Sequence, residues 1–135
     1  MKTITVDGTL CNARPATILS ARLGEAKHPG RIVLELEIRF LDDTRSTGEI
    51  FLDTAPMPGT ASEGTAFGMD CIIHVLRAAK AASWLGLYGA KITALQPATG
   101  NRQPAKGRSL RVLGLAGADA FLFQELADDW TARTL

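Results

Sequence analysis

Hydrophobic and polar residues alternate most regularly between Arg31 and Phe40. The even-numbered residues of this stretch are apolar and most of the odd-numbered ones are charged, which predicts a strand with one buried and one solvated face. Gly48 to Asp53 repeats the alternation, with Ile50 and Leu52 expected to point inward. The two stretches therefore predict an antiparallel hairpin whose even-numbered residues face the core.

The register of this hairpin is expected to follow from parity and charge. Even-numbered residues face the core on both strands only if the loop between the strands has an odd length. A loop at Asp43 to Arg45 places Arg39 opposite Glu49 and Glu37 opposite Phe51. A slip of two residues would place Glu37 opposite Glu49, and like charges at opposing positions are destabilising. We therefore expect the first register.

The longest apolar segment, Phe67 to Leu85, predicts the main helix, with its core-packed part at 67–83. Its polar residues recur at intervals of three and four and form one stripe: Asp70, His74, Arg77 and Lys80. The opposite side carries the residues expected to face the core: Met69, Ile72, Ile73, Leu76, Ala79 and Ser83. Thr65 is suited to cap the helix, and Gly86 and Gly89 are suited to end it.

The remaining elements are shorter. The expected strands are Thr3 to Val6, Thr17 to Leu23, Lys91 to Gln96 and Arg108 to Leu115. The adjacent apolar residues Ile18 and Leu19 predict a bulge, or a bend between two faces, in the second of these. Ala120 to Thr134 is expected to form a C-terminal helix, with an apolar stripe of Phe121, Leu122, Leu126 and Trp130.

Composition predicts one globular domain. The chain has 135 residues, 46% of them hydrophobic and 21% charged, and a net charge of +1. The N-terminus lacks the apolar stretch of a signal peptide, and no apolar run is long enough to span a membrane. Cys11 and Cys71 are an isolated pair and give little reason to expect a disulfide. We expect a cytoplasmic protein without membrane contact.

The expected order of three strands, a long helix, two strands and a terminal helix resembles the OB-fold, whose helix lies between the third and fourth strands of an antiparallel barrel. The stretches that carry the resemblance are 31–40, 48–53, 67–85 and 87–92. Within that group the chain is similar to single-stranded-DNA-binding proteins of phage and plasmid type. The resemblance implies an α+β fold, with a five- or six-stranded, mostly antiparallel OB-like barrel at 16–115, an added N-terminal strand at 1–12 and a C-terminal helix at 119–134.

The resemblance also implies non-catalytic binding of single-stranded nucleic acid on the outer face of the second and third strands. Phe51 and Tyr88 are the aromatic residues expected to stack bases. The cations expected to hold phosphates lie in a polar, turn-rich stretch or just after it: Arg102, Lys106, Arg108 and Arg111. Such binding would be salt-dependent and largely independent of sequence. The alternative for this basic stretch is a solvated loop kept soluble by its charges.

A second functional hypothesis follows from the acidic residues of the same outer face. These residues would repel a phosphate backbone: Glu35, Glu37, Glu49 and Asp53. An acidic face, a net charge near zero and an apolar terminal helix favour a protein-interaction or assembly module without nucleic-acid binding.

No sequence motif marks an active site, and we expect that the protein is not an enzyme. Asp70 and His74 are spaced to hydrogen-bond on one helix, but no nucleophile motif accompanies them. Cys71 and His74 have a spacing that could reach a metal ion, whereas the other candidate ligands, Cys11 and His28, are isolated in the sequence. We expect neither a metal ion nor another cofactor.

Two apolar features predict a homo-oligomer, most simply a twofold dimer. The strand at Thr3 to Val6 can pair with an edge of its own sheet or of a neighbour's sheet. The terminal helix can likewise dock on its own barrel or on that of a neighbour. Periodicity alone does not distinguish these arrangements.

Overall fold

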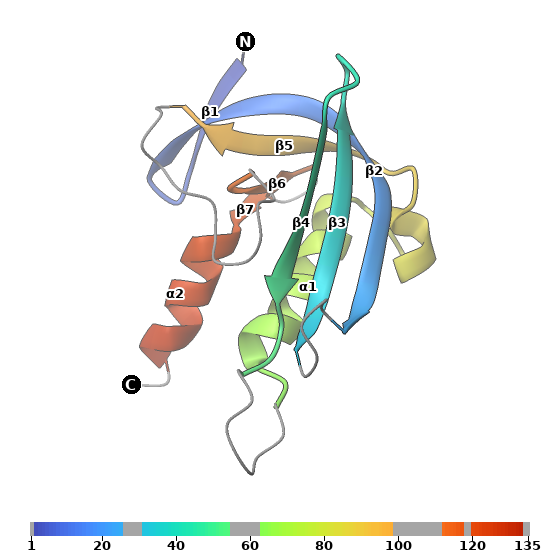
Figure 1. The fold of residues 1–135 in the computed structure, drawn as a ribbon. Helices are drawn as coiled ribbons and strands as arrows, with labels where there is room; N and C mark the ends of the chain where they lie inside the picture. The colour runs from blue at the N-terminus through green and yellow to red at the C-terminus, as the bar shows by residue number, and fades with distance from the viewer. Residues whose placement is uncertain (1, 26–30, 55–62, 99–111, 118–119, 134–135) are drawn as a thin grey trace.

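The protein is an α+β structure built on a curled antiparallel sheet (Figure 1). The computed structural model describes residues 2–25, 31–54, 63–98, 112–117 and 120–133. Strands run in the order β4-β3-β2-β5-β6-β7, and β1 pairs with the first part of β2. Every pairing is antiparallel, and the sheet forms a half-barrel with α1 inside its curve and α2 beside it. The predicted α+β class is confirmed, with an antiparallel curled sheet, a helix in the middle of the chain and a C-terminal helix.

The elements have the following bounds in chain order. The strands are β1 Lys2–Val6, β2 Thr9–Glu25, β3 Ile32–Phe40, β4 Arg45–Phe51, β5 Lys91–Pro97, β6 Gly114–Ala116 and β7 Ala120–Leu122. The helices are α1 Ala66–Ala78, the short 3-10 helix η1 Trp84–Leu87 and α2 Phe123–Arg133.

The long strand β2 organises the sheet, because it pairs with β1, β3 and β5. It begins well before the expected Thr17, and the predicted bulge is confirmed as a register shift between Ile18 and Ser20. The turn from β1 into β2 has positive φ angles of 49° at Asp7 and 78° at Gly8, as tight hairpin turns require.

The expected register of the β3–β4 hairpin is wrong, although its parity is correct. Arg39 lies opposite Arg45, Glu37 opposite Thr47, and Glu35 opposite Glu49. The turn decides this register, because the Phe40 N–H donates to the Thr44 carbonyl and the Asp43 N–H donates to the Phe40 carbonyl, at 2.9 and 3.0 Å. The Asp42 carboxylate accepts from the Thr44 hydroxyl and N–H, and these bonds lower the pKa of Asp42.

The helix α1 starts as predicted but ends earlier than expected. The Thr65 hydroxyl accepts a hydrogen bond from the Gly68 N–H at 2.9 Å, which confirms the N-cap. The helix ends at Ala78, where the N–H groups of Lys80 and Ala81 bond back to carbonyls of the last turn and Lys80 takes a φ of 54°. A lysine therefore occupies the left-handed position that was expected of a glycine, and η1 follows as a separate turn.

The buried face of α1 is also rotated relative to the expectation. Its fully buried residues are Gly68, Cys71, Val75 and Ala78, whereas Met69 is 61% exposed. The expected inward residues Ile72 and Leu76 pack at the border of the core. The side of α1 that carries Asp70 and His74 contacts α2 and β7, so this helix packs on the sheet with one side and on the C-terminal segment with another.

The C-terminal segment differs from the predicted single helix. Phe121 and Leu122 belong to strand β7, which pairs with β6, and α2 begins only at Phe123. Phe121, Phe123 and Leu126 all pack on the main core, so this end of the chain docks on its own domain. Residues 118–119, just before β7, lie outside the described part.

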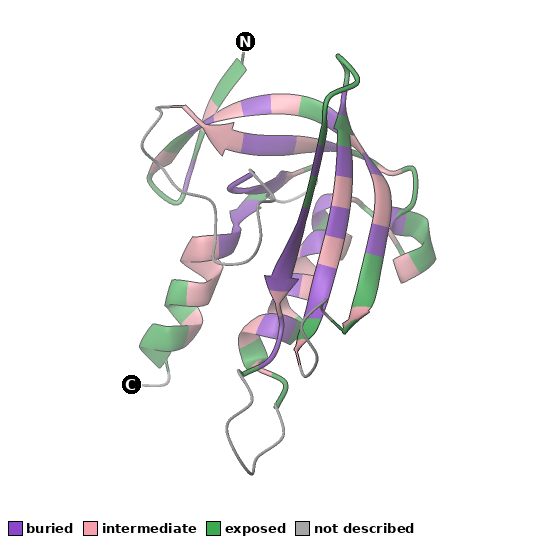
Figure 2. Cartoon of the chain, viewed as in Figure 1, coloured by how far each residue is buried: buried purple, intermediate pink, exposed green. Residues whose placement is uncertain are grey.

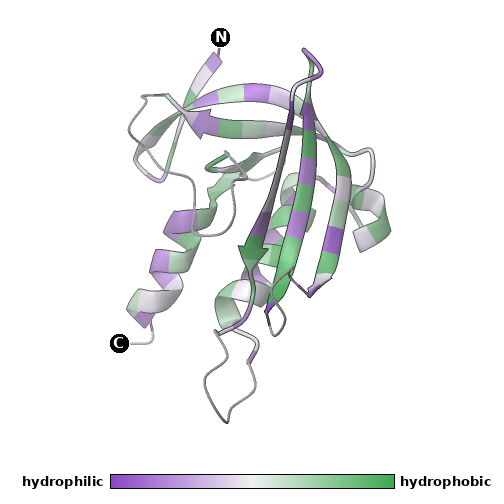
Figure 3. Cartoon of the chain, in the orientation of Figure 1, coloured by the Kyte–Doolittle hydropathy of each residue, from purple (hydrophilic) through white to green (hydrophobic). Residues whose placement is uncertain are grey.

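Two clusters of buried side chains hold the layers together. The main core fills the space between the sheet and α1, with Leu34, Leu36 and Ile38 of β3 at its centre. A smaller cluster gathers Val6, Cys11, Ala13, Leu95, Leu113 and Leu122 at the β1 end of the sheet. From Leu34 to Phe40 burial alternates along β3 as the sequence predicted (Figure 2), and hydropathy alternates over the same residues (Figure 3). At the start of the strand the prediction is wrong, because Ile32 is 41% exposed and Val33 is buried.

Candidate functional site

The structure describes two of the six residues predicted to bind nucleic acid. Phe51 and Tyr88 are described, whereas the predicted phosphate-binding residues lie outside the described part of the chain: Arg102, Lys106, Arg108 and Arg111. Phe51 lies at the end of β4 and Tyr88 directly after η1. The two aromatic residues therefore belong to different parts of the sheet surface.

Phe51 lies in a tightly bonded cluster with Arg31 and Asp53. The Arg31 guanidinium stacks on the Phe51 ring, with its Cζ atom 4.0 Å from the ring centroid. Arg31 also donates from Nε to an Asp53 carboxylate oxygen and from Nη2 to the Asp53 carbonyl, both at 3.0 Å. The second carboxylate oxygen of Asp53 accepts from the Ile32 N–H. One face of the Phe51 ring is thus already covered by a cation.

Tyr88 is 47% exposed but is anchored by its hydroxyl group. The hydroxyl donates to the Ala21 carbonyl of β2 at 2.8 Å, and the Trp84 indole N–H donates to the same carbonyl at 2.9 Å. Both bonds lie beyond the part of β2 that β5 covers. Tyr88 therefore has a fixed ring with an open surface, three residues before Lys91.

A row of cations crosses the outer face of the sheet at one level. Lys91 of β5 and Arg39 of β3 both lie opposite Thr17 of β2, and Arg45 of β4 lies opposite Arg39. We call Lys91, Arg39 and Arg45 the cation row. All three side chains are exposed, and within the described chain Lys91 and Arg39 form no ion pair. Adjacent strands lie about 4.8 Å apart, so the row spans roughly 14 Å.

The cation row was not predicted from the sequence, because it depends on the register of β3 and β4. The expected register placed Arg39 opposite an acid, which would have neutralised it. The one feature of the sequence that could have indicated the row is the positive charge of Arg45, directly after the turn. Lys91 joins the row only through the pairing of β2 with β5, which no local pattern in the sequence predicts.

Acidic residues occupy the next levels of the same face. Glu37 forms an ion pair with Arg45 at 3.7 Å, and Glu35 forms one with Arg22 at 3.5 Å. Glu49 lies opposite Glu35, is 5% exposed, and has a buried carboxylate oxygen without a hydrogen-bond partner among the described residues. The outer face is therefore divided into a basic level beside the β3–β4 turn and an acidic middle.

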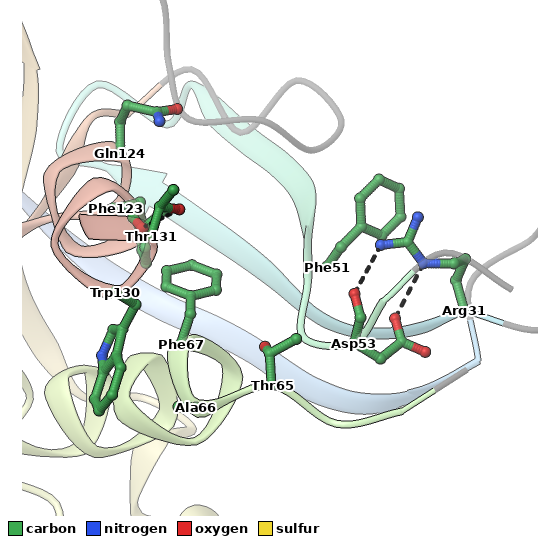
Figure 4. A pocket seen from close by; sticks show the side chains of 11 residues that line it. Arg31, Phe51, Asp53, Thr65, Ala66, Phe67, Phe123, Gln124, Trp130 and Thr131 are labelled. Carbon is green, nitrogen blue, oxygen red and sulfur yellow. Dashed lines mark hydrogen bonds and ion pairs between the residues drawn. The ribbon is translucent and has the colours of Figure 1, made fainter. Parts of the chain in front are cut away.

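A pocket of about 410 Å³ lies between the end of β4, the start of α1 and the inner side of α2 (Figure 4). Arg31, Phe51 and Asp53 form one side of it, and residues of α2 form the other. The complete lining is Arg31, Phe51, Asp53, Thr65, Ala66, Phe67, Phe123, Gln124, Ala127, Trp130 and Thr131. No motif in the sequence indicates this pocket, because its walls come from four separate segments.

The candidate acid–base pair, Asp70 and His74, joins the two helices. His74 Nδ1 lies 3.3 Å from one Asp70 carboxylate oxygen and 2.8 Å from the Asp70 carbonyl oxygen. The other carboxylate oxygen accepts from the Trp130 indole N–H at 2.8 Å, and the His74 ring packs against Phe121. This carboxylate therefore positions α2 on α1.

The candidate metal ligands do not come together in the described part of the chain. Cys71 lies in the main core and Cys11 in the smaller cluster, while His28 is outside the described residues. Burial, with a smaller effect of Asp70, raises the pKa of the Cys71 thiol to about 12. No group of three metal-binding side chains occurs among the described residues.

No family model, curated protein or solved structure matches this chain. Neither α1 nor α2 is long and apolar enough to cross a membrane, and the same holds for every described helix.

Proposed function

We propose that the protein binds single-stranded nucleic acid without catalysing a reaction, and that the cation row contributes the phosphate contacts. The observation that carries this proposal is the alignment of Lys91, Arg39 and Arg45 at one level of an exposed sheet face. Cations spaced across the strands of one sheet can contact several phosphates of a nucleic-acid backbone, whereas a single anion would contact only one of them.

The order of the elements supports an OB-like interpretation of the half-barrel. β2, β3 and β4 form a meander, α1 follows the third of these strands, and β5 returns to β2. In an OB-fold the ligand lies across the second and third strands, which would correspond to β3 and β4. Arg39 and Arg45 belong to these two strands, and the anchored ring of Tyr88 lies close to Lys91 in the sequence.

We expect binding to weaken steeply with salt. Each phosphate neutralised on a single strand contributes a slope of about −0.7 to the plot of log affinity against log salt concentration. Three contacts from the cation row therefore contribute about −2, which is roughly a twentyfold loss of affinity between about 50 and 200 mM salt.

The direct test replaces the cation row. The triple variant Lys91→Gln, Arg39→Gln, Arg45→Gln should bind labelled oligothymidylate more weakly, and its salt slope should be shallower by about 2. Fluorescence anisotropy at several salt concentrations measures both quantities. The matched control Lys2→Gln, Arg77→Gln, Lys80→Gln removes the same charge from exposed residues elsewhere and should keep most of the slope. Equal losses in the two variants, or no binding by the wild type at low salt, would refute the proposal.

The predicted loop cations are tested in the same assay. A quadruple variant with Arg102, Lys106, Arg108 and Arg111 changed to Gln should lose further affinity if these residues bind phosphate. An unchanged affinity would remove the loop from the proposed interface and leave the cation row in it.

The acidic middle of the face supports one alternative, a protein-interaction module. Glu35 and Glu37 are partly exposed on it, with side chains that are 28% and 33% exposed, and carboxylates there would favour a basic partner over a phosphate backbone. If the oligonucleotide does not bind and the variant Glu35→Gln weakens binding of an oligolysine peptide, this alternative is preferred.

A twofold dimer remains a prediction, although its two proposed surfaces are used within one chain. β1 pairs with β2 of the same chain, and α2 packs on α1. Sedimentation at micromolar concentration tests the dimer. A species near 14.4 kDa that persists as the concentration rises would contradict it.

A further inference from the structure

The pocket beside α2 has the size and walls of a ligand site. Its volume of about 410 Å³ falls in the range of small-molecule pockets, roughly 300–1,000 Å³. Phe51, Phe67 and Trp130 supply partly exposed aromatic walls from three different elements, whereas Phe123 also lines the pocket but is almost fully buried. In Figure 4, Phe67 rises from the first turn of α1 between the Arg31 side and the α2 side. Aromatic walls of this kind suit a flat ring.

The hydrogen-bond donors of Arg31 would select which edge of a flat ligand ring faces this residue. Its guanidinium has five N–H donors, and within the described chain it gives Nε and one Nη2 donor to Asp53. The Phe51 ring and the Asp53 bonds hold the guanidinium plane in place. The donors on its outer edge then form a fixed fork, which requires two neighbouring acceptors on the ligand.

We infer that this pocket binds a nucleobase, with the ring between the aromatic walls and two adjacent acceptors on the Arg31 fork. Guanine presents such a pair in O6 and N7, whereas adenine presents a donor beside its N7. Because Asp53 balances the charge of Arg31, the site would favour a neutral ring with two neighbouring hydrogen-bond acceptors over a negatively charged ligand. The inference rests on the proposed function, because that function supplies nucleobases as ligands.

The base can come from a bound strand or from a free nucleotide, and both present the same chemistry. Trp130 lines the pocket, and the chain has two tryptophans. In a Trp84→Phe background Trp130 is therefore the only tryptophan reporter. We expect guanosine monophosphate to quench its emission saturably, with about tenfold tighter binding than adenosine monophosphate. Ribose 5-phosphate, which lacks the ring, should give no saturable change.

Two substitutions and one control substitution test whether the quenching arises in the pocket. Ala127→Leu places a larger side chain on the α2 wall and should abolish the quenching, whereas Ala132→Leu, on the same helix but outside the lining, should preserve it. Arg31→Lys keeps the charge beside Asp53 but loses the fork. It should bring the affinities for the two nucleotides to within about twofold of each other, and a urea titration of each variant confirms that it is folded.

The outcomes separate this inference from the proposed function. Loss of both nucleotide and oligoguanylate affinity in Ala127→Leu places a base of the strand in the pocket, and loss of nucleotide affinity alone assigns the pocket to free nucleotides. Both results support the inference. Absence of saturable quenching by guanosine monophosphate, or equal quenching by ribose 5-phosphate, overturns it. The cation-row variant still tests strand binding in that case.

Discussion

Replacing Asp53 with alanine is expected to lower the free energy of unfolding by about 3 kcal/mol. The Asp53 side chain is 3% exposed, and its carboxylate binds the Arg31 guanidinium and the Ile32 N–H at 3.0 Å each. Without it the Ile32 N–H loses its acceptor, and the guanidinium, whose side chain is 20% exposed, keeps only the residue 53 carbonyl and the Phe51 ring among its partners in the described part of the chain. Urea unfolding followed by circular dichroism measures the loss.

The matched control for this prediction is an ion pair on the surface. Glu37 and Arg45 are 3.7 Å apart, with side chains that are 33% and 59% exposed. Glu37→Gln should therefore change the free energy of unfolding by less than about 1 kcal/mol. If Asp53→Ala cost no more than this control, the cluster of Arg31, Phe51 and Asp53 would not be a stabilising unit of the fold.

Replacing Gly68 with alanine is expected to destabilise the protein by about 1–3 kcal/mol or more. In an exposed helix the same change would stabilise by about 1 kcal/mol, because alanine has the higher helix propensity. At Gly68 a Cβ atom would overlap the backbone carbonyl of Leu52. That carbonyl accepts hydrogen bonds from the N–H and the hydroxyl of Thr65, so the start of α1 would have to move away from the sheet.

Gly64 provides the control for this substitution, four residues earlier in the chain. A Cβ atom at Gly64 would have no atom within 4 Å, and the residue does not have a positive φ. Gly64→Ala should be neutral, or stabilising by up to about 1 kcal/mol through a less flexible unfolded chain. Thermal unfolding of both variants measures the difference in their stability. A Gly68→Ala protein as stable as Gly64→Ala would mean that α1 does not pack as closely on Leu52 as described.

Secondary structure could be predicted wherever a short-range pattern in the sequence was strong. Alternation predicted β3 and β5 nearly to the residue, and Thr65 predicted the start of α1. The adjacent apolar residues at 18 and 19 predicted the bulge of β2. These features depend on the side-chain period of a strand and on one capping bond, and both are local in the chain.

The cation row and the pocket could not be predicted from the sequence, because they join residues that are distant in the chain. Lys91 reaches the level of Arg39 only through two strand pairings across β2. The pocket joins the end of β4 to α2, some seventy residues further along the sequence. Phe51 was predicted as an open stacking platform, and the structure places Arg31 on its ring.

The register of β3 and β4, the buried faces of α1 and the split of the C-terminal segment depend on contacts between distant parts of the chain. The register places Glu35 opposite Glu49, against the expectation from charge, because the backbone hydrogen bonds of the turn fix the pairing of the two strands. Phe121 became a strand residue because β6 offered it a pairing edge. Hydrophobic periodicity records which residues are apolar, whereas the partner that buries each of them is set by the packing of the whole chain.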